Sequence, residues 1–135
     1  MKVVLANGCF DIIHYGHIMH LREARSMGTR LVVALTADEA VRKGPGRPVN
    51  SWPYRAAVLL ELRCVSEVLC SKNAVDAIYN VKPDIFVKGI DYAKGDKFTE
   101  NVEDACAFVG AEIRFTTTPK MSVNDLIKRT MALHA

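Results

Sequence analysis

Hydrophobic positions along the chain fall into two alternating patterns, short apolar runs and longer segments with helical spacing. The short runs have the length of strands that are buried in a parallel sheet, and they cover residues 2–6, 30–36, 67–70, 84–88 and 112–116. The helical segments cover residues 16–27, 53–63, 74–81, 99–109 and 122–133. Because strand and helix alternate with short connections, the pattern predicts an α/β fold: a five-stranded parallel sheet with helices on both faces.

Residues typical of turns and helix caps lie between these predicted strands and helices. Asn7-Gly8 predicts a turn directly after the first strand. Residues 43–51, KGPGRPVNS, are rich in glycine and proline and predict a loop, which Ser51 ends as a candidate N-cap of the next helix. No linker, repeat or low-complexity tract interrupts the order, so we expect a single domain over residues 1–135.

Composition narrows the functional class only moderately. Half of the residues are apolar and 24% are charged, which is typical of a globular domain. The formal net charge of +3 favours anionic ligands but is too small to indicate nucleic-acid binding. The four cysteines form no Cys-x-x-Cys pair and fit a reducing compartment. We expect a cytoplasmic protein without a signal peptide or a membrane span of about 18 apolar residues.

The segment with the densest chemistry is residues 7–20, NGCFDIIHYGHIMH, where the first strand gives way to the first helix. Ligands of open parallel sheets bind at the carboxyl ends of strands, and helix N-termini hold phosphate groups. Gly8 and Gly16 allow the backbone to approach a ligand closely. His14 and His17 flank Gly16, so two imidazoles can donate hydrogen bonds to one polyphosphate.

Other interpretations of this segment are weaker. A zinc site needs further ligands, and Cys9 does not have a known zinc spacing. Either histidine alone could be a surface or cap residue, Asp11 is expected to bond local backbone N–H groups, and His20 is expected to pack on the helix face. The segment lacks Gly-x-Gly-x-x-Gly, which disfavours a dinucleotide-dependent oxidoreductase.

The motif G-x-F-D-x-x-H-x-G-H is formed here by Gly8, Phe10, Asp11, His14, Gly16 and His17. It resembles the signature of the cytidylyltransferase-like nucleotidyltransferases, a family that includes glycerol-3-phosphate cytidylyltransferases and the adenylyltransferases that make ADP-heptose. The resemblance implies a Rossmann-like α/β sandwich in which His14 and His17 contact the triphosphate and stabilise the transition state. It also implies Mg²⁺ that bridges phosphates without a dedicated protein site, and attack of an acceptor phosphate on the α-phosphorus.

Further site residues follow from the same resemblance, which runs nearly the whole length of the chain. Residues 47–50 with 54–55, and residues 83–89 with 91–92, look closest to the heptose adenylyltransferase pattern. The expected catalytic residues are His14, His17, Lys43 and Arg55. The expected nucleotide contacts are Gly8, Cys9, Phe10, Gly16, Lys88, Gly89, Asp91 and Ser122. The expected acceptor contacts are Lys43, Arg47, Trp52 and Arg55.

The last motif departs from the family pattern. Relatives carry Ile-Ser-Thr-Thr or Cys-Ser-Thr-Thr before the final helix, whereas this chain has Met121-Ser122-Val123-Asn124. Ser122 keeps the hydroxyl that can cap the helix and contact phosphate. Asn124 and Val123 replace two threonines, so the base and the acceptor stay open.

The sequence thus predicts a nucleotidylyltransferase that moves a nucleoside monophosphate from a triphosphate to a phosphorylated small molecule and releases pyrophosphate. ATP with heptose 1-phosphate is the best single guess. A CTP-dependent enzyme acting on glycerol 3-phosphate, another polyol phosphate or a phosphonate is the first alternative, and an inactive nucleotide-binding regulatory module is the second. The resemblance also implies a homodimer.

Overall fold

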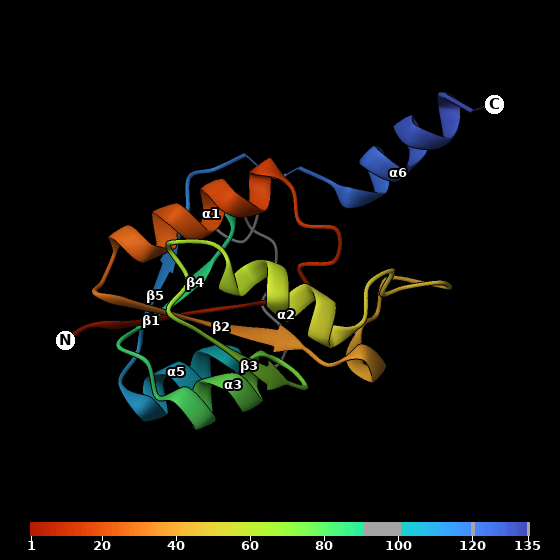
Figure 1. Ribbon diagram of the computed structural model, residues 1–135. Coiled ribbons are helices and arrows are strands. Elements are labelled where there is room, and N and C mark those ends of the chain that lie inside the picture. Colours follow the sequence, from red (N-terminus) through yellow and green to blue (C-terminus); the bar gives the residue numbers. More distant parts are fainter. Residues whose placement is uncertain (91–100, 120, 135) are drawn as a thin grey trace.

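The computed structural model describes residues 1–90, 101–119 and 121–134, and its centre is a five-stranded sheet (Figure 1). All neighbouring strands are parallel, in the order β3-β2-β1-β4-β5. The strands are β1 (Val3–Gly8), β2 (Arg30–Thr36), β3 (Glu67–Ser71), β4 (Ile85–Lys88) and β5 (Glu112–Phe115). The predicted Rossmann-like parallel sheet is therefore confirmed.

Helices cover both faces of this sheet, as the alternating pattern predicts. The described helices are α1 (Tyr15–Ser26), α2 (Trp52–Leu60), α3 (Ala74–Val81), α5 (Val102–Val109) and α6 (Val123–Ala132), with a short 3-10 turn η1 (Asp38–Ala40). Figure 1 shows α1 and α2 on one face and α3 and α5 on the other. None of the described helices is long and apolar enough to cross a membrane.

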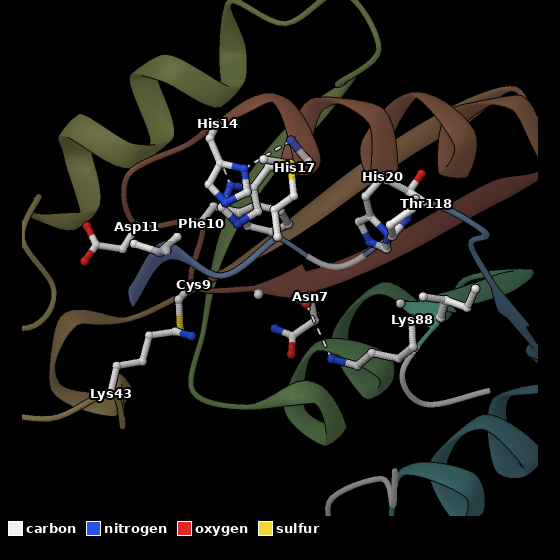
Figure 2. Close-up of a pocket in the computed structure, with 17 residues that line it drawn as sticks. Asn7, Cys9, Phe10, Asp11, His14, His17, His20, Lys43, Lys88 and Thr118 are labelled. Carbon is white, nitrogen blue, oxygen red and sulfur yellow. Dashed lines mark hydrogen bonds between the residues drawn. The ribbon is translucent and has the colours of Figure 1, made fainter. Parts of the chain in front are cut away.

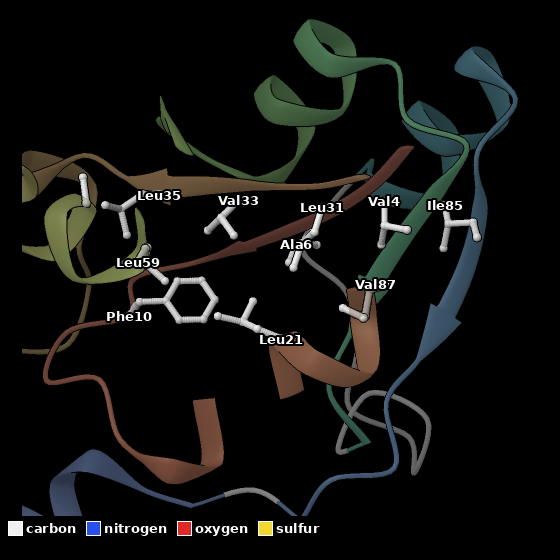
Figure 3. Packing of buried hydrophobic residues seen from close by; sticks show 12 residues of the cluster. Val4, Ala6, Phe10, Leu21, Leu31, Val33, Leu35, Leu59, Ile85 and Val87 are labelled. Atoms are coloured by element: carbon white, nitrogen blue, oxygen red, sulfur yellow. The ribbon is translucent and has the colours of Figure 1, made fainter. Parts of the chain in front are cut away.

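Two hydrophobic clusters fill the space between the sheet and the helices. Alternate residues of the central strand β1 serve different faces, because successive side chains of a strand point in opposite directions. Val4 and Ala6 pack with Leu21 of α1 and Leu59 of α2, as Figure 3 shows. Leu5 belongs to the second cluster, with residues of α3 and α5.

The structure differs from the sequence-based boundaries mainly at the edge where the site lies. Asn7 and Gly8 belong to β1 rather than to a turn, because they pair with Ala34 and Leu35 of β2. Ser51 precedes α2 as predicted, but its side chain makes no capping hydrogen bond. Helix α2 ends at Leu60 instead of residue 63. The expected start of the fourth helix at residue 99 lies outside the described residues.

Helix α6 is the exception to the layered packing. None of its side chains is buried, and Figure 1 shows it projecting away from the sheet and its covering helices. Its N-cap is Ser122, whose hydroxyl accepts a hydrogen bond from the Asp125 N–H at 3.3 Å. The predicted cap is therefore confirmed, although the helix it begins does not cover the sheet.

Candidate active site

The candidate site is a cleft of about 210 Å³ at the carboxyl edge of the sheet. It lies beside the neighbouring ends of β1 and β4, where the strand order reverses direction and open α/β sheets bind their ligands. Its walls come from the loop after β1, the start of α1 and the end of β4, and Lys43 reaches it from the loop before α2 (Figure 2). Thr118, Pro119, Met121 and Val123 complete the lining. The expected site residues that line it are Gly8, Cys9, Phe10, His14, Gly16, His17, Lys43, Lys88 and Gly89.

Two histidines cap helix α1 reciprocally. His14 is the N-cap, and its Nδ1 accepts a hydrogen bond from the Gly16 N–H at 3.1 Å. His17, three positions further on, returns the interaction, since its Nδ1 accepts from the His14 N–H at 3.2 Å. The rings stack with their centroids 4.0 Å apart (Figure 2). The arrangement satisfies backbone N–H groups that a helix start otherwise leaves unpaired.

This capping also fixes which ring nitrogen carries the proton. A nitrogen that accepts a hydrogen bond holds no proton, so the neutral ring of each histidine is protonated at Nε2. His14 Nε2 is buried and has no hydrogen-bond partner among the described residues. A buried unpaired donor costs about 1–3 kcal/mol, and a ligand oxygen in the cleft would remove that cost. The two Nε2–H groups are suited to an anionic ligand.

Small residues and one strained loop make room for the stacked rings. A Cβ at Gly16 would lie 3.0 Å from His14 Cε1 and 3.1 Å from the Met121 side chain. Phe10 has a left-handed backbone with φ of 45°. Its ring and the His17 ring pack edge to face, with their centroids 5.4 Å apart. A Cβ at Gly8 would lie 2.9 Å from that phenyl ring. Glycine is therefore needed at both positions because of the aromatic rings beside them.

The electrostatic surroundings keep His17 neutral. Burial lowers the pKa of His17 to about 4, with further contributions from His14, His20 and Lys43. At neutral pH the ring is therefore an uncharged Nε2–H donor. Positive charge in the cleft comes instead from lysines.

Lys43 and Lys88 supply positive charge from two sides of the cleft (Figure 2). The Lys88 ammonium lies 5.6 Å from the Phe86 ring centroid and donates a long hydrogen bond of 3.5 Å to the Asn7 carbonyl. Asn7 is itself fixed, since its amide donates to the Ala34 carbonyl and to Ser71 Oγ. Asp91, the expected neighbour of Lys88 in the site, lies outside the described residues.

Asp11 lines the cleft but does not present a free carboxylate to it. One oxygen accepts from the Val49 N–H at 2.7 Å and from Arg47 Nε at 2.8 Å, and the other accepts from the Asn50 N–H at 3.0 Å. Burial alone would raise the pKa of Asp11, but the hydrogen bonds from Asn50, Val49 and Arg47 outweigh it and lower the pKa. Asp11 thus bonds backbone N–H groups as expected, although these groups are distant in sequence rather than local.

Four expected contacts do not line the cleft. Arg55 is 1% exposed, and its nitrogens donate to the Asn50 carbonyl, the Cys9 carbonyl and the Asp38 carboxylate. Trp52 Nε1–H donates to the Leu35 carbonyl, and its ring packs against the core. Arg47 pairs with Asp11, and Ser122 caps α6. Arg55 and Trp52 were expected to contact the acceptor, but neither side chain lines the cleft, because each donates to backbone carbonyl groups of the protein itself.

The cleft also contains two residues that the sequence interpretation did not place there: His20, which was expected to pack on the helix face, and Thr118. His20 lines it, and its Nδ1 lies 2.7 Å from Thr116 Oγ1. Because His20 follows His17 by three positions, helical spacing alone places it on the same face, and this signal was available in the sequence. Thr118 is brought there by Glu23 of α1, which accepts from its hydroxyl at 3.2 Å. No local sequence signal predicts the contact between Thr118 and Glu23, because the two residues are 95 positions apart.

A parallel sheet of this order, with paired imidazoles at its opening β–α turn, defines the chain as a nucleotidyltransferase domain. The chain belongs to the cytidylyltransferase-like family, whose sequence model matches residues 5–129.

Among curated relatives, the chain is similar to proteins named bifunctional protein HldE. The protein of Methylococcus capsulatus is 37% identical over 131 residues, which cover 94% of this chain and 26% of that protein. The protein of Pseudomonas savastanoi is 47% identical over 95 residues, which cover 67% of this chain and 20% of that protein. The chain therefore spans about a quarter of the length of the curated relatives that it matches.

Two solved structures share this fold with the chain. The lipopolysaccharide core biosynthesis protein from Thermoplasma volcanium has a TM-score of 0.72 and 30% identity, and the match covers 90% of this chain and 99% of that one. Pantothenate synthetase from Thermus thermophilus has a TM-score of 0.62 and 14% identity, covering 93% of this chain and 58% of that one. The second likeness concerns the fold alone.

The pKa of His17 gives a first prediction. In a ¹⁵N-imidazole titration of the folded protein, His17 should show the neutral Nε2–H tautomer at pH 7 and a midpoint of about 4. Between pH 6.5 and 4 the unfolded chain binds more protons at this ring than the folded chain does. The free energy of unfolding should therefore fall as pH is lowered through this window. A midpoint near 6.5 would contradict the neutral-donor assignment.

The position of Arg55 gives a second prediction. Arg55→Lys keeps the positive charge but cannot replace three directional hydrogen bonds, so it should lower the free energy of unfolding by about 3 kcal/mol. Urea denaturation measures this loss, with Arg63→Lys at an exposed position as the matched control, expected to stay within about 0.5 kcal/mol. Unchanged stability combined with a raised KM for the acceptor would instead support acceptor binding.

Proposed function

We propose that this domain transfers an adenylyl group from ATP to the phosphate of a sugar 1-phosphate, with heptose 1-phosphate as the best candidate, and releases pyrophosphate. The observation that carries the proposal is the pair of Nε2–H donors that the α1 cap holds at the cleft. The similarity to HldE proteins over 94% of the chain, and to a lipopolysaccharide core biosynthesis protein, supports a sugar phosphate as the acceptor.

The chemistry that these residues can perform is positioning together with charge stabilisation. The triphosphate lies against the N-terminus of α1, where backbone N–H groups and both imidazoles donate to its oxygens. An oxygen of the acceptor phosphate forms a bond to the α-phosphorus, and the bond from that phosphorus to the bridging β-phosphate oxygen breaks. Its electron pair leaves with pyrophosphate. The attacking phosphate is ionised at neutral pH, so no general base is required.

Two lysines reduce the repulsion between these anions. In the proposal, Lys43 reaches the triphosphate or the acceptor phosphate, and Lys88 approaches the nucleotide from the end of β4, beside Gly89. The neutral imidazole of His17 contributes a directional donor without adding positive charge to the cleft. Gly8, Cys9 and Phe10 form the floor of the nucleotide site, and Asp91 and Ser122 stay in the proposal as nucleotide contacts.

Mg²⁺ fits this site only as an ion that arrives with the triphosphate. Among the described residues no group of three or more histidine, cysteine or acidic side chains is placed to hold a metal. Asp11, the carboxylate in the cleft wall, already accepts three hydrogen bonds. When bound, Mg²⁺ would neutralise phosphate charge, with phosphate oxygens as its ligands.

The cellular setting and assembly belong to the same proposal. All four cysteines are free, which supports a reducing compartment such as the cytoplasm. Tyr54, Val58 and Leu60 of α2 are exposed, which supports burial of this helix in a homodimer.

Pyrophosphate release in a substrate matrix tests the proposal directly. The protein with Mg²⁺ should release pyrophosphate fastest from ATP with heptose 1-phosphate, and more slowly from CTP or from either triphosphate with glycerol 3-phosphate. Preference for CTP and glycerol 3-phosphate would replace the proposed substrates while keeping the reaction class. Triphosphate binding without release in any combination would favour a regulatory module.

Asparagine variants of the two histidines separate capping from catalysis. In His14→Asn and His17→Asn the amide oxygen takes the place of Nδ1, so the cap of α1 is kept while the Nε2–H donor is lost. Each variant should lower kcat by about 100-fold or more, the usual loss of a donor that binds transition-state charge. Steady-state pyrophosphate release gives kcat, and isothermal titration calorimetry gives the Kd of the triphosphate.

The triphosphate Kd should change far less than kcat in both variants. His134→Asn, at an exposed position near the end of the described chain, is the control and should behave as the parent protein. Equal losses in kcat and binding would contradict a transition-state role.

A further inference from the structure

Among the described residues, one side-chain hydrogen bond links helix α6 to the rest of the chain. Its side chains are not buried, and within residues 1–90, 101–119 and 121–134 a single hydrogen bond joins residues 122–134 to the body of the domain. In this bond Arg47 Nη1 donates to Asn124 Oδ1 at 2.9 Å across 77 residues of sequence. Asn124 is one of the two residues that replace threonines of the family pattern.

The other side of the Arg47 guanidinium is anchored to Asp11. Arg47 Nε donates to Asp11 Oδ2 at 2.8 Å, and the two side chains are 7% and 0% exposed. The same carboxylate holds the Val49 and Asn50 N–H groups. We call the chain of contacts Asp11–Arg47–Asn124 the Arg47 clasp. A buried, charge-assisted pair of this kind is costly to break.

The clasp joins two walls of the cleft. On one side is the loop of residues 43–50, which carries Lys43. On the other side are Met121 and Val123, which line the cleft directly before and at the start of α6. These walls are 70 to 80 residues apart in sequence, and no strand pairing connects them. The clasp therefore ties the loop that carries Lys43 to the opposite wall of the cleft.

We propose that Arg47 and Asn124 are positioning residues, which hold Lys43 in place for the transition state of phosphoryl transfer. Arg47 does not line the cleft: its Nε and Nη1 are bonded to protein, and its Nη2 is buried, with no hydrogen-bond partner among the described residues. It therefore acts through Lys43, which lines the cleft. The inference rests on the proposed function. It assigns to the altered Ser122-Val123-Asn124 segment a task that does not involve reading the base.

A double-mutant cycle tests the coupling to Lys43. Asn124→Ala should lower kcat by about tenfold, because small misplacements of a catalytic group are expensive, and Asn124→Asp should restore it since a carboxylate also accepts from Nη1. In a Lys43→Ala background, Asn124→Ala should lower kcat by less than about twofold, because Lys43, through which Asn124 acts, has been removed. If Asn124→Ala lowered kcat by the same factor with and without Lys43, the proposal would be overturned. An increase in the acceptor KM of Arg47→Ala that persists without Lys43 would also overturn it, in favour of direct acceptor binding.

Hydrogen exchange tests the clasp without any turnover. Asn124→Ala should speed amide exchange at Val49 and Asn50 by about fivefold or more, because Arg47 then holds Asp11 less firmly. Asn80→Ala, the same change at an exposed position of α3, is the control and should leave both exchange and activity unchanged. Unaltered exchange in Asn124→Ala would overturn the clasp. If the parent protein released no pyrophosphate, the proposed function would fail, while this measurement would still decide whether the clasp exists.

Discussion

The reciprocal hydrogen bonds between His14 and the first turn of α1 are the interaction on which the chemistry of this protein depends. They satisfy two backbone N–H groups at a helix start, which is a structural task. In doing so they use the Nδ1 atom of each imidazole and leave both Nε2–H groups at the cleft. One local arrangement thus stabilises the helix and presents two Nε2–H donors to the cleft.

The charged residues around this cap divide into two groups with different tasks. Lys43 and Lys88 line the cleft. Arg47 and Arg55 are buried and bind the protein instead, Arg47 through Asp11 and Arg55 through carbonyl groups of two loops. A guanidinium suits this second task because it presents several donors in one plane. The loops that form the cleft are therefore held by arginine, and the cleft itself is lined by lysine.

The fold was predictable because local pattern and tertiary structure agree at nearly every element. Apolar runs became the buried strands of the sheet, and helical spacing placed Leu21 and Leu59 against it. The errors are concentrated at the carboxyl edge. Asn7-Gly8 has the composition of a turn, yet both residues pair with β2, because a neighbouring strand supplies their backbone partners. Helix α6 has a correct start, but its sequence does not reveal that it leaves the sheet uncovered.

The sequence by itself determined the fold class and the position of the paired histidines, because both depend on spacing over a few residues. It also placed Lys43 in a loop and Lys88 at the carboxyl end of a strand, the edge of a parallel sheet where ligands bind. Only the tertiary structure decided the roles of Arg47, Arg55 and Asp11. Their partners lie 5 to 77 residues away in sequence, and all but Asn50 are at least 17 residues away. A charged side chain looks the same in sequence whether its partner is a substrate phosphate or the protein's own backbone.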